Sequence, residues 1–101
     1  MWYVYIVKCS DDSYYTGITT DVERRLNEHN SGTGAKYTKG RAPVELEEFK
    51  EFDNRSDASR EEARIKKLTR SKKEQLIGEW RVNRLRIEHV ISNDDLLKIK
   101  K

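Results

Sequence analysis

The sequence has few of the residues that cross-link a chain or anchor it in a membrane. It contains a single cysteine, Cys9, so no disulfide can form within the chain, and a reducing cytoplasm is its expected location. No apolar run approaches the roughly 20 residues that a membrane-spanning helix needs. The N-terminal residues lead directly into a strand pattern and lack the basic and apolar segments of a secretion signal. These absences argue against a membrane protein and against a disulfide-stabilised secreted domain.

Charged residues are abundant and unevenly distributed. They make up 39% of the 101 residues, against 35% for hydrophobic residues, which predicts one soluble domain with a modest core. The net charge of +3 is too small to indicate a nucleic-acid partner by itself. Acidic residues dominate between Glu45 and Glu62, whereas Arg64 to Lys73 contains six basic residues and no acidic one. That basic block fits either a solvated helix face or a surface that contacts phosphates.

Aromatic and β-branched residues predict two strands, over residues 2–9 and 13–18, that pair as an antiparallel hairpin. The turn between them holds two aspartates, which favour turn geometry. Gly17 interrupts the second strand and indicates a bulge or a place where a ligand or another backbone comes close. Residues 44–52 predict a third strand, although the segment EFKEF breaks its alternation and leaves its register open.

Capping signals predict two helices after the hairpin. Thr20 and Glu23 form a capping box before a helix that ends at the NSG segment of residues 30–32, where glycine suits the left-handed terminal position. A loop that carries three of the five glycines and the only proline follows. Asparagine, serine and aspartate at the start of residues 54–69 provide caps for the second helix.

The last third of the chain divides less clearly. Ser71 and Glu74 form a capping box for a third helix that reaches about Trp80. Beyond it, the pattern fits a strand as well as a helix. Residues 1–80 are therefore assigned to the main domain, and residues 81–101 to a C-terminal extension of uncertain structure.

Two helix faces that should be apolar carry charged or titratable side chains. On the first helix the inward stripe includes Arg25 and His29. On the second helix Glu62 stands between Ala58 and Ile65 in the most apolar stripe. A carboxylate at such a position is costly unless a cation or a metal ion meets it.

Two explanations of these faces stay open. In the first, Arg25 and Glu62 form a structural salt bridge, His29 is an ordinary interior histidine, and Tyr5 and Tyr15 are half-buried strand aromatics. In the second, all five side chains converge on one functional patch, because perturbed titratable groups gather at such sites.

The pattern resembles the GIY-YIG nuclease family. YVY (Tyr3–Tyr5) stands for the first triplet and YTG (Tyr15–Gly17) for the second, with Arg25 ten residues after Tyr15 and His29 four residues further on. Glu62 falls where the family keeps its glutamate. The chain is most similar to the small single-domain bacterial members, often filed as uncharacterised, over about Trp2 to Ile77, including the segment GAKYTKGRAPV.

The resemblance implies an α+β fold: a GIY-YIG domain with a three-stranded antiparallel β-sheet flanked by helices. It implies a metal-dependent phosphodiesterase that acts on nucleic acid, with DNA as the expected substrate. DNA repair or recombination is the expected process, and a larger repair assembly the expected setting. No membrane is implied as a partner, and the oligomeric state stays open.

The resemblance also implies roles for the site residues. Glu62 would hold a single Mg²⁺ or Mn²⁺, which needs few protein ligands. Arg25 would neutralise the phosphate with its planar guanidinium. Tyr5 and Tyr15 are both candidates for the general base, and His29 would orient a tyrosine or shuttle its proton.

Further residues are candidates for substrate binding. Gly17 would let the substrate backbone approach, and basic side chains of the loop and of the segment after the second helix would contact flanking phosphates. Each of the basic residues could equally be a solubilising surface side chain. The basic candidates are Lys36, Lys39, Arg41, Lys66, Lys67, Arg70 and Lys72.

Two departures from the family pattern keep other functions open. Many enzymatic members have an asparagine about three helical turns after the glutamate, where this chain has Glu74 and Gln75. Some place a lysine just after the second triplet, where this chain has Ile18. The alternative is a catalytically weak or inactive nucleic-acid-binding module with the same fold. A third reading is a protein–protein adaptor that uses the acidic stretch from Glu45 to Asp57.

Overall fold

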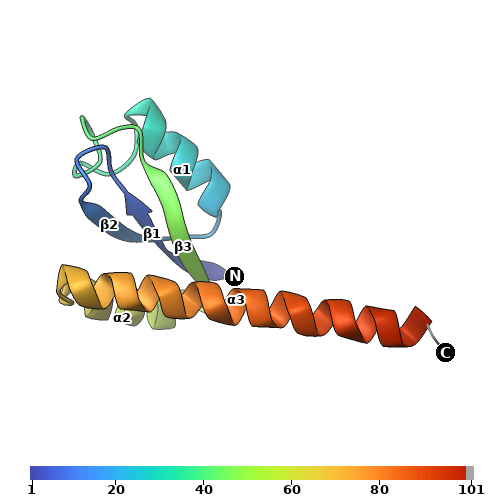
Figure 1. Ribbon diagram of the computed structural model, residues 1–101. Helices are drawn as coiled ribbons and strands as arrows, with labels where there is room; N and C mark the ends of the chain where they lie inside the picture. Colours follow the sequence, from blue (N-terminus) through green and yellow to red (C-terminus); the bar gives the residue numbers. More distant parts are fainter. Residues whose placement is uncertain (100–101) are drawn as a thin grey trace.

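The computed structural model describes residues 1–99 of the chain, and the side chains of residues 1–87. In chain order the elements are β1 (Trp2–Lys8), β2 (Tyr14–Thr19), α1 (Val22–Ser31), β3 (Glu45–Phe52), α2 (Arg55–Lys66) and α3 (Arg70–Ile99). The three strands form one antiparallel sheet in the order β2-β1-β3 (Figure 1). The predicted α+β fold with a three-stranded antiparallel sheet is therefore confirmed.

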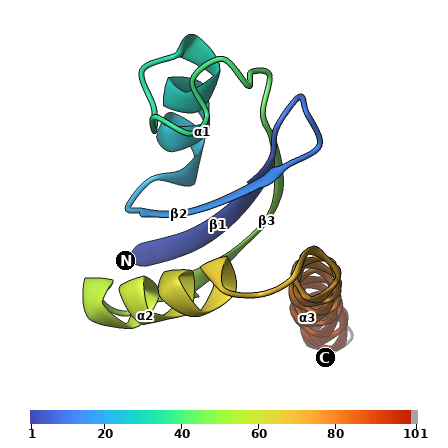
Figure 2. The same cartoon turned by 90° about the vertical axis from the view of Figure 1, so that its left-hand side faces the viewer.

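Both faces of the sheet are covered, so the central strand β1 is buried on both sides. Figure 2 shows α1 on one side of the sheet and α2 and α3 on the other. Alternation along β1 sends Val4 and Ile6 into the core beneath α2 and α3. Tyr5 and Val7 point into a second core beneath α1. Tyr5, the last tyrosine of the first triplet, is thus an interior residue of the α1 side.

The cap of α1 differs from the predicted one. Asp21, rather than Thr20, is the N-cap, and its side chain accepts a hydrogen bond of 3.0 Å from the backbone nitrogen of Arg24. Because the helix starts one residue later than the predicted capping box requires, Glu23 is not in the position to close it. At the other end Gly32 adopts φ 83°, the left-handed C-cap that the NSG segment predicts.

α3 is much longer than the predicted third helix. It starts at Arg70, with the Thr69 hydroxyl accepting a hydrogen bond of 3.3 Å from the backbone nitrogen of Lys72, so the predicted cap at Ser71 is wrong by two residues. It then runs without a break to Ile99, which settles the helix–strand ambiguity of residues 81–99 in favour of the helix. Residues 100 and 101 lie outside the described residues. None of the described helices has the length and apolar character that crossing a membrane requires.

Strand β3 turns a carboxylate inward and an aromatic ring outward. Glu48 is 3% exposed, whereas Phe49 is 38% exposed. Residues 48–52, the segment EFKEF, pair with β1 in regular register, so Phe49 and Phe52 lie on opposite faces of the sheet. The one shift of register between these strands lies just before this segment, at Glu47. Glu48 is met by α3, because its carboxylate lies 3.1 Å from Nε of Arg84 and 3.6 Å from Nε of Arg81. Two guanidiniums therefore fasten α3 to the sheet beside the apolar contacts of the core.

Candidate active site

The two motif tyrosines meet across the hairpin. Tyr5 lies opposite Gly17 in the strand register, and the ring centres of Tyr5 and Tyr15 are 6.4 Å apart. A Cβ atom at Gly17 would come within 2.5 Å of the Tyr5 hydroxyl oxygen. The close approach predicted at Gly17 is thus made by the phenol of Tyr5, in the place where a substrate backbone was expected.

Helix α1 places His29 directly against Tyr5. His29 is fully buried, and its Nε2 lies 2.7 Å from the Tyr5 hydroxyl oxygen. The other ring nitrogen, Nδ1, lies 2.7 Å from Oγ1 of Thr38, a loop residue that is 1% exposed. The inward orientation predicted for His29 is correct. Sequence reasoning did not single out Thr38, because a lone threonine in an irregular loop has no periodic pattern to mark it.

Arg25 lies one turn before His29 on the same face of α1. Its guanidinium is half-buried and pairs with Glu28 at 3.1 Å. Its positive charge works to lower the pKa of both Tyr5 and Tyr15. Glu62 pairs with Lys66 at 3.8 Å. The structural salt bridge considered between Arg25 and Glu62 is therefore not the arrangement found, and each residue has a neighbour of its own.

Glu62 reaches the same site from the other side of the sheet. It lies on α2 between the fully buried Ala58 and Ile65, and its side chain stays 24% exposed. Its negative charge contributes to raising the pKa of both Tyr5 and Tyr15. The carboxylate thus acts on both phenols while keeping access to solvent.

Burial sets the protonation states of the site. It raises the pKa of Tyr5 to about 12, although the nearby Arg25 guanidinium works in the opposite direction. Burial likewise raises the pKa of Tyr15. The pKa of His29 is lowered by burial and then by the positive charge of Arg25. At neutral pH both phenols are therefore protonated and the imidazole is uncharged.

The donor set of the site suits one hard divalent cation. Among the side chains that the structure describes, no group of three or more His, Cys, Asp or Glu residues could hold a metal ion. At this site Glu62 offers a partly exposed carboxylate. Mg²⁺ commonly binds through one or two carboxylates and keeps several waters, so this donor set fits it. In this structure the positive charge beside the carboxylate is the Lys66 ammonium, 3.8 Å from Glu62.

A row of stacked groups extends from Tyr15 toward the surface. The Tyr15 and Tyr37 rings are stacked with centres 5.8 Å apart and planes inclined by 21°. Nζ of Lys66 lies 5.7 Å from the centre of the Tyr15 ring, and Cζ of Arg41 lies 4.2 Å from that of Tyr37. Lys66 and Arg41, two of the predicted phosphate-binding residues, therefore border the site through aromatic rings.

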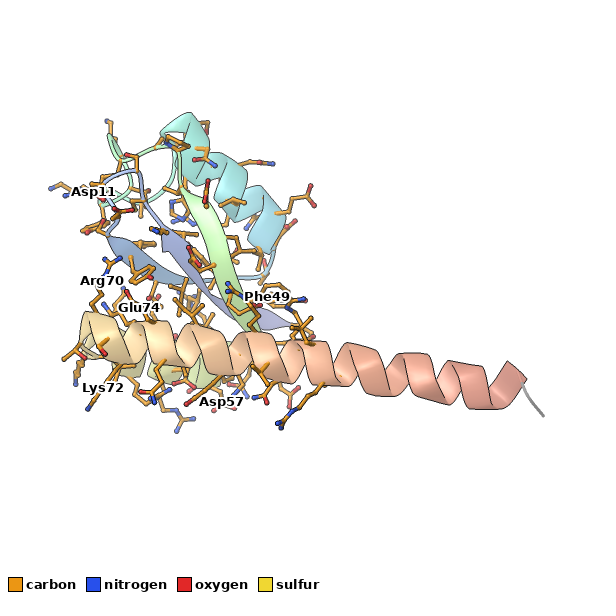
Figure 3. The ribbon with its side chains drawn as sticks, in the orientation of Figure 1. Asp11, Phe49, Asp57, Arg70, Lys72 and Glu74 are labelled. Carbon is orange, nitrogen blue, oxygen red and sulfur yellow. The ribbon has the colours of Figure 1, made fainter. Side chains whose placement is uncertain are left out.

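The remaining basic candidates are distributed more widely. Arg70 lies over the Tyr14 ring at 4.5 Å and donates a hydrogen bond to the backbone oxygen of Asp12. Figure 3 shows Arg70 on the side of α3 toward the hairpin and Lys72 on the opposite side. Lys36, Lys39 and Lys67 are exposed.

The two departures from the family pattern also have their own structural partners. Glu74 pairs with Arg70 at 3.1 Å on the surface, and Gln75 is exposed, so neither reaches the phenols. Ile18 packs against the core beneath α2 and α3. The positions where the resemblance led us to expect an asparagine and a lysine thus serve surface pairing and packing in this chain.

Comparison with known proteins agrees with the geometry. Residues 1–75 match the family model described as the GIY-YIG catalytic domain. A UPF0213 protein of Haloquadratum walsbyi is 64% identical over 77 residues, which are 76% of this chain and 86% of that protein.

Two solved structures are similar in fold as well as in sequence. The solution NMR structure of UPF0213 protein BH0048 from Bacillus halodurans has 52% identity and a TM-score of 0.51, covering 77% of this chain and 84% of that chain. The solution NMR structure of protein EF2693 from E. faecalis has 50% identity and a TM-score of 0.57, covering 79% and 85%. The names of these relatives state no activity.

Proposed function

Since the chain belongs to the GIY-YIG family, we propose that it is a metal-dependent phosphodiesterase that cuts DNA. The observation that carries the proposal is the contact of the buried Tyr5 hydroxyl with Nε2 of His29, at 2.7 Å, beside the Arg25 guanidinium, whose charge lowers the pKa of this phenol. A phenol between a guanidinium and a neutral imidazole has a cation to stabilise its phenolate and a base to take its proton.

The contacts favour Tyr5 over Tyr15 as the general base. Tyr5 passes its proton to Nε2 of His29 and takes one from the attacking water, whose oxygen bonds to phosphorus as the phosphorus–oxygen bond to the leaving group breaks. The buried His29 returns its proton to Tyr5, which releases the proton taken from the attacking water, and the leaving oxygen is protonated by water. Tyr15 is linked to His29 only by ring contact, with centres 5.3 Å apart.

The charged residues divide the electrostatic work. The planar guanidinium of Arg25 suits the non-bridging oxygens of a phosphate. Glu62 would hold the single Mg²⁺ or Mn²⁺, which supplies positive charge to the phosphate and to the leaving oxygen. Lys66 and Arg41, which lie over the Tyr15 and Tyr37 rings, would contact the next phosphates along the strand. Such contacts add affinity without sequence preference, which suits a structure-selective enzyme of DNA repair or recombination working within a larger assembly.

A cleavage assay tests this function. Plasmid, nicked and branched DNA are incubated with Mg²⁺, with Mn²⁺ or with chelator, using the wild type, Glu62→Gln and Glu61→Gln. Glu61 is a matched control, because it lies next to Glu62 on α2 and pairs with Arg64. We expect metal-dependent cutting by the wild type and by Glu61→Gln, and none by Glu62→Gln. Equal cutting by all three proteins would remove Glu62 from the mechanism.

A nucleic-acid-binding module without turnover is the second candidate. The observation that favours it is that Glu74 is paired with Arg70 on the surface where enzymatic relatives place an asparagine. In the same assay this candidate predicts salt-sensitive binding of DNA and no cutting under any metal condition. If the protein neither binds nor cuts DNA, the remaining candidate is the protein–protein adaptor that the acidic stretch suggests.

A further inference from the structure

We propose that Thr38 is a positioning residue that holds His29 in the tautomer with hydrogen on Nδ1, leaving Nε2 as the acceptor for the proton of Tyr5. The consequence for cutting rests on the proposed function. The tautomer itself is a property of the folded protein and can be measured without any substrate.

The direction of the hydrogen bonds follows from a backbone carbonyl. Oγ1 of Thr38 lies 2.9 Å from the carbonyl oxygen of Ala35, which can only accept, so the single hydroxyl hydrogen of Thr38 is used there. The same Oγ1 lies 2.7 Å from Nδ1 of His29 and must therefore accept from it. Nδ1 then carries a hydrogen, and in the neutral ring Nε2 carries none.

The contact of Tyr5 fits the same tautomer. The phenol oxygen lies 2.7 Å from Nε2 of His29, so an unprotonated Nε2 can accept the phenol hydrogen. With the opposite tautomer Nε2–H would be the donor in this contact, and the phenol hydrogen would lose this acceptor.

The loop that carries Thr38 is built closely against the imidazole. A Cβ atom at Gly34 would lie 2.5 Å from Nδ1 and 2.9 Å from the Cα atom of His29, so only glycine lets the loop backbone lie there. Thr38 is 1% exposed, which keeps water from replacing its hydroxyl. The ring is therefore held from behind by a dry, fixed acceptor.

Three variants separate this role from ordinary packing. Thr38→Val keeps the shape and removes the hydroxyl, whereas Thr38→Ser keeps the hydroxyl. Thr33→Val is the matched control, because its hydroxyl lies in the same loop and contacts Ser31 and the backbone of Glu28 instead of His29.

The readout is the long-range ¹H–¹⁵N spectrum of the histidine rings near pH 7.5, with His89 assigned through His89→Asn. We expect a protonated Nδ1 and an unprotonated Nε2 in the wild type, in Thr38→Ser and in Thr33→Val. Thr38→Val should shift His29 toward the other tautomer. A wild type with hydrogen on Nε2, or an unchanged spectrum in Thr38→Val, overturns the proposal. If Thr38→Val does not fold, the wild-type spectrum and Thr38→Ala still decide it.

Cleavage kinetics test the consequence separately. Thr38→Val should lower kcat by about tenfold or more, within the range of general acid–base catalysis, and leave KM and the Mn²⁺-induced rise in Tm unchanged. Thr38→Ser should restore kcat, and equal kcat in Thr38→Val would contradict the role in catalysis. If the wild type does not cut DNA, the proposed function fails, while the spectra still decide the tautomer.

Discussion

The hydroxyl of Tyr5 on β1 lies 2.7 Å from Nε2 of His29 on α1, and both residues are almost completely buried. This contact joins the first motif triplet to the helix that carries Arg25. Because the site is made by the interior of the α1 side, changes to its packing should change its chemistry.

A side chain at position 17 should displace the Tyr5 phenol. We expect Gly17→Ala to lower the free energy of unfolding by about 1–3 kcal/mol, since the new Cβ would meet the Tyr5 hydroxyl at 2.5 Å. Gly78→Ala is the control, because nothing lies within 4 Å of a Cβ there and alanine favours a helix by about 1 kcal/mol. Chemical denaturation measures the free energy of unfolding of both variants. A Gly17→Ala protein as stable as the wild type would contradict the close contact.

Replacing Arg25 should separate catalysis from stability. We expect Arg25→Ala to slow cutting by about 100-fold or more, as loss of a transition-state charge does. Its surface ion pair with Glu28 should cost less than about 1 kcal/mol of folding free energy. Arg24→Ala, one position along the same helix, should cut normally. A collapse of stability in Arg25→Ala alone would indicate a structural role instead.

Metal binding at Glu62 should be visible without substrate. A ligand that binds only the folded state raises Tm, so Mn²⁺ should raise the Tm of the wild type and of Glu61→Gln. Glu62→Gln should show no rise, because it lacks the carboxylate. Differential scanning fluorimetry over a range of Mn²⁺ concentrations makes the comparison. The same rise in Glu62→Gln would place the metal ion elsewhere.

The raised pKa of Tyr5 makes a prediction about alkaline stability. In the folded protein this phenol has a pKa of about 12, against about 10 in the unfolded chain. Its contribution to the free energy of unfolding is therefore fully present below about pH 10 and is lost as the pH rises toward 12. The size of this contribution is about 3 kcal/mol. Stability measured between pH 9 and pH 11.5 should fall more steeply in the wild type than in Tyr5→Phe. Parallel curves would mean that Tyr5 ionises normally in the folded protein.

The sequence predicts the sheet and the inward face of α1 because those features follow local patterns. Alternation along β1 places Tyr5 inside, and helical spacing places Arg25 and His29 on one face. The same reasoning did not identify the hydrogen-bond partner of Nδ1 of His29. Thr38 comes from an irregular loop, and the path of such a loop depends on contacts distant in the sequence.

Helix ends and the C-terminal segment were harder to predict for a different reason. A capping box at Thr20 and one at Ser71 are both plausible locally, yet Asp21 and Thr69 are the residues that bond the free backbone nitrogens. α3 contacts β3 through Arg81 and Arg84, and local sequence patterns do not reveal these contacts. Only the three-dimensional register reveals that Glu48 is the inward residue of that strand.

Two arginines of α3 contact the same buried carboxylate of β3, so either one can maintain the attachment of the helix to the sheet. Arg84 and Arg81 both approach the carboxylate of Glu48, at 3.1 and 3.6 Å. Substitution of either arginine leaves the other guanidinium beside the carboxylate. The loss of folding free energy in the double variant should therefore exceed the sum of the losses in the two single variants. Loss of Glu48 has no such substitute, because it removes the buried carboxylate that both arginines share, although Arg81 keeps its contact with Glu47.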